Sequence, residues 1–252
     1  MNDKLKTTAI LAMTADGKIA DYKKSAARFG SQNDKRHLEQ QVSLVDGVIF
    51  GANTLRAYGT TLSVSDPQLI EARKNRCQSP QPVQIVVSTS GNLNTAWQFF
   101  QQPIPRWLLT IPTTARKWQD RWVFERILTT PMLTPTATSP NNFSASDGLA
   151  ASNTKQSGSS VDWLSAFGQL SELGLTKLAI LGGGELIASL IELNLIDELW
   201  LTVCPLILGG YNAPTPVGGR GFIQSAGKKL KLLEIKQIES EIFLHYQILI
   251  GR

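Results

Sequence analysis

The run from Lys177 to Ile191 constrains the fold most, because an apolar strand pattern ends in three glycines that lead directly into an amphipathic helix pattern. Gly182, Gly183 and Gly184 have no β-carbon, so a ligand can approach the backbone closely at this turn. The free N–H groups and the positive dipole end of the next helix favour an anion. The run predicts a phosphate-binding turn, and an ordinary strand-to-helix turn is the alternative interpretation.

A second turn of the same kind lies between Asp46 and Arg56. A short apolar run ends at Gly51, and the small polar residues Asn53 and Thr54 are suited to the start of a helix. Two helix starts directed at one ligand suit the several phosphates of a dinucleotide. The G-x-G-x-x-G and G-x-x-x-x-G-K-[ST] fingerprints do not occur in the chain, so the hypothesis rests on the two turns together.

Strand and helix patterns alternate along most of the chain. Strands are expected at 7–13, 48–51, 83–88, 106–111, 125–129, 177–181 and 197–207, and helices at 35–45, 66–76, 161–173 and after 184. The ranges 230–235 and 241–250 alternate as a hairpin does. This order predicts a single α/β domain over 1–252, with a mainly parallel central sheet, helices on both faces and a C-terminal antiparallel hairpin.

The segment 131–160 interrupts this order. It is rich in Pro, Thr, Ser, Asn, Ala and Gly, and Asp147 and Lys155 are its only charged residues. Structureless loops of this length are uncommon inside a domain unless they are functional or disordered. We expect a flexible insertion here.

Charge and composition narrow the classes of partner. The net charge is +5, but the basic residues are scattered, which argues against nucleic-acid binding and favours an anionic small molecule. No run approaches the roughly 20 apolar residues of a membrane-spanning helix. Cys77 and Cys204 are too few for a disulfide framework, and Cys204 reads as a core residue. A cytoplasmic protein with no nucleic-acid or membrane partner is expected.

A metal centre is not expected. His37 lies on a charged helix pattern and His245 lies in the terminal hairpin, and neither has a ligand partner nearby in the sequence. No P-C-x-x-C zinc signature occurs. Structural roles are predicted for both histidines.

Four segments, in this order, resemble the reductase domain of riboflavin biosynthesis, which in bacteria is the C-terminal half of the bifunctional pyrimidine deaminase-reductase. They are 13–20, 51–57, 182–184 and 197–210. The resemblance covers nearly the whole chain apart from 131–160. It implies a dihydrofolate-reductase-like fold and an enzyme that uses NADPH to reduce the ribosyl group of a ribosylaminopyrimidine 5′-phosphate to a ribityl chain.

The resemblance also implies roles for particular residues. Asp16 and Lys18 would be catalytic and face the substrate. The residues expected to bind the cofactor are Met13, Gly51, Asn53, Thr54, Ser88, Thr89, Ser90, Gly183, Gly184, Glu185, Leu186 and Ile187. Those expected to bind the substrate are Thr14, Ser31, Tyr58, Leu62 and Gly182.

Each role has a plainer alternative. Asp16 and Gly17 form a common turn dipeptide, and Lys18 can be a solvated charge. Thr54 can cap the backbone, and Glu185 can complement the helix dipole.

Departures from the family pattern bear on the substrate. The family commonly has an Asp-Asp-Pro run where this chain has Tyr58, Gly59 and Thr60, and an acidic residue where it has Gly182. In the family, two basic residues help to hold the substrate phosphate, and this chain has Val42 and Ser65 near those positions. Arg28 and Arg56 are possible replacements. A reductase for a pterin or another imine or carbonyl is therefore the first alternative, and a non-catalytic nucleotide-binding protein is the second.

The terminal hairpin suggests self-association. Leu244, Tyr246, Ile248 and Ile250 lie on one alternating face that a second copy could cover. A homodimer is expected, partly from the resemblance.

Overall fold

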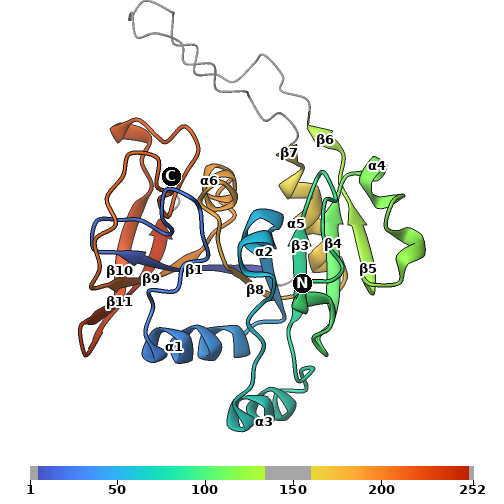
Figure 1. Cartoon of the computed structure of the whole chain (residues 1–252), viewed down its shortest axis with the longest axis horizontal. Helices are drawn as coiled ribbons and strands as arrows, with labels where there is room; N and C mark the ends of the chain where they lie inside the picture. Colours follow the sequence, from blue (N-terminus) through green and yellow to red (C-terminus); the bar gives the residue numbers. More distant parts are fainter. Residues whose placement is uncertain (1–4, 134–159, 250–252) are drawn as a thin grey trace, which may run out of the picture.

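The computed structural model describes residues 5–133 and 160–249, and one nine-stranded sheet runs through it (Figure 1). The strands lie in the order β10-β11-β9-β1-β8-β2-β3-β4-β5. Their bounds are β1 (Lys6–Thr14), β2 (Gly47–Gly51), β3 (Val83–Val87), β4 (Arg106–Thr110), β5 (Arg126–Thr129), β8 (Lys177–Ile180), β9 (Glu198–Cys204), β10 (Lys229–Ile238) and β11 (Glu241–Leu249).

Neighbouring strands from β9 to β5 are parallel, whereas β11 runs antiparallel to both β9 and β10. The mainly parallel sheet with a C-terminal antiparallel hairpin is thus confirmed. The expected strand 197–207 ends earlier, at Cys204, because Pro205 has no N–H to continue the ladder.

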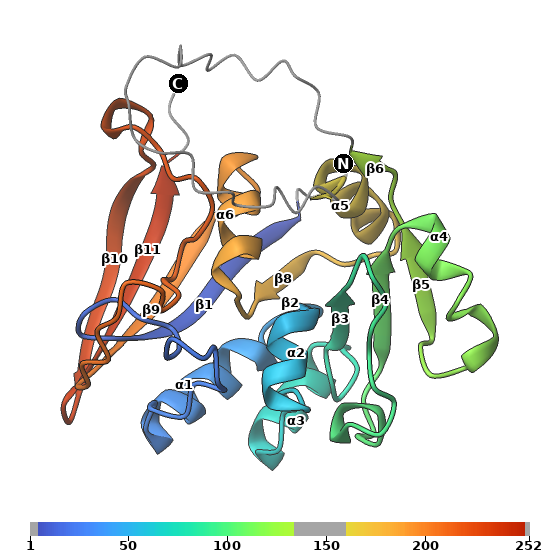
Figure 2. The ribbon, with the colours of Figure 1, turned by 45° about the horizontal axis from the view of Figure 1, so that its top comes forward.

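Helices cover both faces of the sheet, as predicted. Figure 2 shows α5 and α6 on one face and α1, α2 and α3 on the other. Their bounds are α1 (Gln32–Ser43), α2 (Ala52–Tyr58), α3 (Pro67–Asn75), α4 (Pro112–Ala115), α5 (Trp163–Glu172) and α6 (Gly184–Glu192). Short 3-10 turns occupy Gln98–Phe100, Gln119–Arg121 and Gln224–Ala226.

Most helix starts follow local sequence signals. Ser31 caps α1, Asp66 caps α3 with Pro67 at its first position, and Asp162 caps α5. The helices α2, α4 and α6 begin without a side-chain cap, and the N-cap of α2 is Gly51. Asn53 and Thr54 therefore lie inside that helix and do not cap it.

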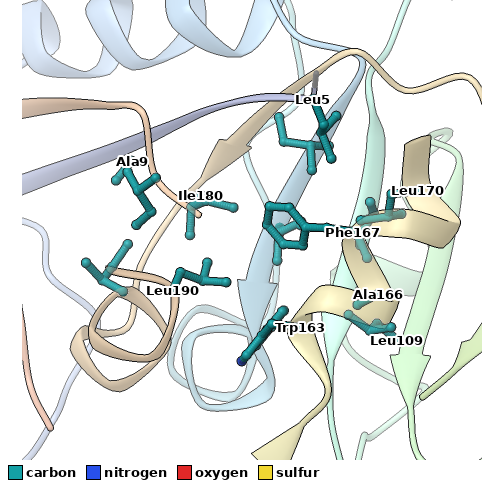
Figure 3. Close-up of a cluster of buried hydrophobic side chains, with 14 of the residues drawn as sticks. Leu5, Ala9, Leu109, Trp163, Ala166, Phe167, Leu170, Ile180 and Leu190 are labelled. Atoms are coloured by element: carbon teal, nitrogen blue, oxygen red, sulfur yellow. The ribbon is translucent and has the colours of Figure 1, made fainter. Parts of the chain in front are cut away.

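Two hydrophobic clusters hold the layers together, one on each face of the sheet. Figure 3 shows the first, where Trp163, Phe167 and Leu170 of α5 pack near Ile180 of β8 and Leu190 of α6. The second lies beneath the helices of the other face and includes Val42, Val48, Phe50, Leu55, Leu108 and Phe243. Cys204 is fully buried, which confirms its prediction as a core residue.

Arg73 of α3 is buried to 1% exposure, a placement that the sequence did not predict. Its guanidinium donates to the carbonyl oxygens of Ser79 at 2.7 Å, Ser43 at 2.9 Å and Val45 at 2.7 Å. It therefore satisfies the carbonyls at the end of α1 and links that end to α3.

The flexible insertion predicted for 131–160 falls mainly on residues 134–159, which lie outside the described residues. At its two ends, β6 (Met132–Leu133) pairs antiparallel with β7 (Ser160–Val161). Ile250 of the expected hairpin face also lies outside the described residues.

Candidate functional site

The two glycine turns meet at one edge of the sheet. Strand β8 lies between β1 and β2, and all three are parallel, so their carboxyl ends reach the same edge. The N–H of Leu181, which begins the glycine turn after β8, donates to Ile49 of β2 at 2.9 Å. The segments that follow these three strands therefore form one rim.

Gly183 and Thr54 face each other across this rim. A β-carbon built on Gly183 would lie 3.9 Å from the Thr54 hydroxyl oxygen and within 4 Å of no other atom. Gly182 has a φ of +84°, which residues with a β-carbon rarely adopt. The glycine turn thus opens toward α2, as a cradle for an anion requires.

The N–H groups that α6 leaves free at its start belong to the residues before Ile187. Gly183 is the N-cap, and its carbonyl accepts the N–H of Ile187 at 3.1 Å. The Ile187 side chain is fully buried in the core. The expectation that Ile187 binds the cofactor is therefore corrected, because its N–H is used inside the helix. The N–H groups that a helix start leaves free belong to the residues before it, Gly184, Glu185 and Leu186.

A loop after β9 packs against the other side of this helix start. A β-carbon on Gly184 would lie 2.4 Å from the carbonyl oxygen of Thr215, and Gly218 donates its N–H to Gly184 at 3.0 Å. The Glu185 carboxylate accepts the N–H of Gly219 at 3.3 Å. Sequence reasoning missed this loop, although the glycines at 218 and 219 were a signal of close backbone contact.

The turn after β1 is fixed by Asp16. Its carboxylate accepts the hydroxyl of Thr14 at 2.5 Å and the backbone N–H groups of Leu208 at 3.2 Å and Gly209 at 2.6 Å. The hydrogen bond from Thr14 and those from the two N–H groups lower the pKa of Asp16. Asp16 therefore holds two loops together as a carboxylate, which is a poor basis for a proton donor.

Thr14 is fully buried, and its hydroxyl oxygen also accepts the N–H of Lys18 at 2.9 Å. Its side chain has no surface free for a substrate, so the substrate-binding role expected for Thr14 is corrected to a structural one. Lys18 is half-buried, and no carboxylate of residues 5–133 and 160–249 lies within salt-bridge distance of its ammonium. Met13, the last residue but one of β1, is half-buried at the same rim.

An acidic residue at the start of α1 was not singled out from the sequence. Burial raises the pKa of Asp34. A hydrogen bond with the Thr202 side chain lowers this pKa, and the charge of Glu241 raises it further. The only sequence signal was the Ser31-to-Asp34 capping pattern, which predicts a role for Asp34 within the helix.

The capping pattern is only half formed. The Ser31 hydroxyl accepts the N–H groups of Asn33 and Asp34, but the Ser31 N–H donates to Glu241 at 2.8 Å and not to Asp34. The Ser31 hydroxyl also donates to Glu241 at 2.5 Å. Ser31 is thus engaged in the fold, and the carboxyl group of Asp34 is left for Thr202.

Tyr58 closes the rim at the end of α2. Its hydroxyl donates to the carbonyl of Ala27 at 2.9 Å, burial raises the pKa of Tyr58, and the charge of Arg28 acts in the opposite direction. Leu62 is half-buried and packs against the second hydrophobic cluster. Positions 42 and 65 cannot hold a substrate phosphate, because Val42 is fully buried and Ser65 is bonded to Glu39.

The turn after β3 extends the rim past β2. The buried hydroxyl of Ser88 accepts the N–H of Gly91 at 3.0 Å, Thr89 O accepts the hydroxyl of Thr114 at 2.5 Å, and Ser90 is exposed. Arg56 donates to Asn53 at 2.5 Å and to the carbonyl of Asn92 at 3.4 Å. Arg56 therefore lies on the β3 side of α2, away from Lys18 at the end of β1.

Neither a membrane helix nor a metal cluster is found in the described part of the chain. Within residues 5–133 and 160–249, no helix has the length and apolar character needed to cross a bilayer. In the same ranges, no group of three or more His, Cys, Asp or Glu side chains could hold a metal ion.

Two curated proteins are similar to this chain over most of its length. The chain is 25% identical over 239 residues to the 2,5-diamino-6-ribosylamino-4(3H)-pyrimidinone 5′-phosphate reductase of Archaeoglobus fulgidus, covering 90% of this chain and 91% of that protein. It is 24% identical to the riboflavin biosynthesis protein RibD of Actinobacillus pleuropneumoniae, over 94% of this chain and 55% of that protein. The chain thus spans about half the length of that second relative.

Solved structures share the fold. A pyrimidine reductase-like protein from Corynebacterium diphtheriae has a TM-score of 0.72 at 20% identity, covering 99% of this chain and 94% of that chain. RibD of Acinetobacter baumannii has a TM-score of 0.73 at 16% identity, covering 98% of this chain and 58% of its own. The family described as the RibD C-terminal domain matches residues 6–244, and the chain belongs to that family.

Proposed function

We propose that this chain is a riboflavin-pathway reductase that uses NADPH to reduce the ribosyl group of a (di)aminopyrimidine ribosylamino 5′-phosphate to ribityl. The observation that carries the proposal is the approach of Gly183 to Thr54, which brings the two glycine turns together at one rim that would bind an anion. Family membership and the names of the reductase relatives support the reaction class.

The rim suits a dinucleotide that runs across the ends of four adjacent strands. The N–H groups of Gly184, Glu185 and Leu186, with the Thr54 hydroxyl, would hold the pyrophosphate. The turn Ser88–Ser90 follows β3, which is two strands beyond β8, and neighbouring strands are about 4.8 Å apart. This turn would meet the adenosine end of the cofactor, and Arg56 would be a cation for the adenosine 2′-phosphate. On the other side of β8 lies β1, and the backbone of Met13 near its end would then lie at the nicotinamide end.

When bound, NADPH supplies the hydride, and the chain must bind, orient and protonate the substrate. Burial, and then the charge of Glu241, raise the pKa of the Asp34 carboxyl group, which favours Asp34 as the proton donor of this proposal. Lys18 would face the substrate, and Arg28, exposed beside Tyr58, would be a cation for the substrate phosphate.

Steady-state oxidation of NADPH by the purified chain, with 2,5-diamino-6-ribosylamino-4(3H)-pyrimidinone 5′-phosphate as substrate, tests the proposal. We expect turnover that depends on this substrate and a product heavier by two hydrogen atoms in mass spectrometry. NADPH binding without turnover of any imine or carbonyl would instead favour a non-catalytic nucleotide-binding protein.

A different substrate is the second candidate, and one contact favours it. Tyr58 donates its hydroxyl to Ala27, so a phenol occupies the position where the family pattern has a carboxylate. A pterin or another imine would need fewer carboxylate partners for sugar hydroxyls. Faster turnover of such a compound than of the ribosylaminopyrimidine phosphate would support this candidate.

We also propose that the protein forms a homodimer through the hairpin. Leu244 and Tyr246 share one sheet face with Leu232 and Ile235, which are 48% and 63% exposed. Ile248, on the same face, is already buried in the first hydrophobic cluster. Light scattering of the purified chain tests the dimer, and Ile235→Lys should shift it toward the monomer.

A further inference from the structure

The loop after β9 touches two separate parts of the candidate site. Residues 205–219, called the strap from here on, follow the end of β9 and contact both the turn after β1 and the start of α6. Within the strap, Ala213 is the only buried side chain. A loop with so little buried surface is held in place mainly by its hydrogen bonds.

One set of these bonds fixes the turn after β1. The N–H of Ala15 donates to the carbonyl of Leu206 at 2.8 Å. The N–H of Ile19 donates to the carbonyl of Pro214 at 2.9 Å. Lys18 lies between the two donors in the sequence. The strap therefore holds the stretch of backbone that carries Lys18.

A second set of contacts places the strap on the start of α6. The N–H of Gly218 donates to the carbonyl of Gly184 at 3.0 Å. The N–H of Gly219 donates to the Glu185 carboxylate at 3.3 Å. A β-carbon on Gly184 would lie 2.4 Å from the carbonyl oxygen of Thr215, a separation that real β-carbons do not show. The strap can take this position only because Gly184 has no side chain.

Two consecutive residues of the strap carry both contacts. The carbonyl of Pro214 accepts the N–H from the turn after β1, and the carbonyl of Thr215 lies against Gly184. A planar peptide holds consecutive α-carbons about 3.8 Å apart, so Thr215 cannot be displaced without moving Pro214. The start of α6 and the turn after β1 are thus linked through a single peptide unit.

We propose that Gly184 and Glu185 are positioning residues that fix the turn 14–19 through the strap. This inference rests on the proposed function, in which the N–H groups at the start of α6 hold the cofactor and Lys18 faces the substrate. The glycine turn would then have two tasks, to bind the pyrophosphate and to set the position of the backbone on the substrate side.

The exchange rate of the Ile19 amide, measured by NMR in the chain without cofactor, tests the link. Gly184→Ala should raise this rate about tenfold, because the new methyl group displaces the strap and with it the acceptor of the Ile19 N–H. Gly168→Ala is the matched control, since a β-carbon at Gly168 meets no atom within 4 Å. The Leu181 amide, which donates to β2 before the glycine turn, should keep its wild-type rate in both variants.

Glu185 gives a second route if Gly184→Ala does not fold. Glu185→Ala should raise the Ile19 rate about threefold, because the strap loses one hydrogen bond. Glu185→Gln keeps an acceptor oxygen and should restore the wild-type rate. Glu172→Ala, an exposed change at the end of α5, is the matched control. An unchanged Ile19 rate in Gly184→Ala and Glu185→Ala, or an equal rise at Leu181, would overturn the proposal.

Turnover separates this inference from the proposed function. If the chain reduces the ribosylaminopyrimidine phosphate, Glu185→Ala should lower kcat by about threefold or more without weakening NADPH binding, because its backbone N–H remains. Glu185→Gln should restore kcat. An unchanged kcat in Glu185→Ala would show that the reaction does not need this positioning and would overturn it. If the wild type shows no turnover with this substrate, the proposed function fails, while the Ile19 exchange rate still decides whether the strap links the two turns.

Discussion

Asp16 and Gly209 are joined by a 2.6 Å hydrogen bond from the backbone N–H of Gly209 to the Asp16 carboxylate. The bond fastens the turn after β1 to the loop after β9, and the N–H of Leu208 donates to the other carboxylate oxygen at 3.2 Å. Asp16 is therefore a structural carboxylate at the rim of the site, and the catalytic role that the family resemblance implies for it stays a prediction.

Replacing Asp16 by Asn should lower thermal stability near neutral pH, because an amide oxygen accepts these N–H bonds less strongly. The hydrogen bond from Thr14 is the largest cause of the lowered pKa of Asp16. The stability that the Asp16 carboxylate contributes is thus fully present above pH 3.8, the ordinary pKa. It is lost as the pH falls through the lower pKa that Asp16 has in the folded protein. Melting temperatures of both proteins across acid pH should converge; a difference that persists in strong acid would contradict this role. Asp120→Asn is the exposed control.

Gly183→Asp should abolish NADPH binding, because a carboxylate would enter the space between the α6 start and Thr54. Titration calorimetry measures the affinity. Gly168→Asp is the matched control, since a β-carbon at Gly168 in α5 meets no atom within 4 Å. Unchanged NADPH affinity in Gly183→Asp would refute the cradle.

Lys18→Ala should lower kcat by about tenfold or more and leave the Kd for NADPH near its wild-type value, because Lys18 lies at the β1 end and not at the cradle. Steady-state kinetics and calorimetry together check this. Lys23→Ala, in the exposed part of the following loop, is the control. Parental turnover in Lys18→Ala would show that the active site is misplaced.

Arg73→Met should lower the free energy of unfolding by about 3 kcal/mol or more, since it removes three hydrogen bonds of a buried guanidinium and leaves the carbonyl of Val45 without that donor. Denaturant unfolding measures the change. Arg76→Met, which loses one bond to Ser43 from an exposed residue, should cost much less. Equal losses in the two variants would contradict the assigned role of Arg73.

Local signals predicted the frame of the fold well. Asp66 with Pro67 marked the start of α3, and the alternation of strands and helices predicted parallel neighbours, because crossovers are right-handed and adjacent. The shared rim followed from this order alone, since the carboxyl ends of β8 and β2 must meet.

What the sequence could not predict depends on contacts between distant residues. Ser31 and Glu241 are 210 positions apart, and only their contact diverts the Ser31 N–H from the capping box and leaves Asp34 free. In the sequence Arg73 is an ordinary cation of a helix, and only the fold brings the end of α1 next to it. No local sequence pattern predicts the close contact between the backbones of Thr215 and Gly184.

Amide hydrogen exchange with and without NADPH tests most directly whether the two glycine turns bind one nicotinamide nucleotide together. If both turns bind one NADPH molecule, NADPH should slow exchange in both 51–56 and 182–186, with the same dependence on its concentration. Slowing in one segment alone, or in neither, would show that the two turns do not bind the nucleotide together.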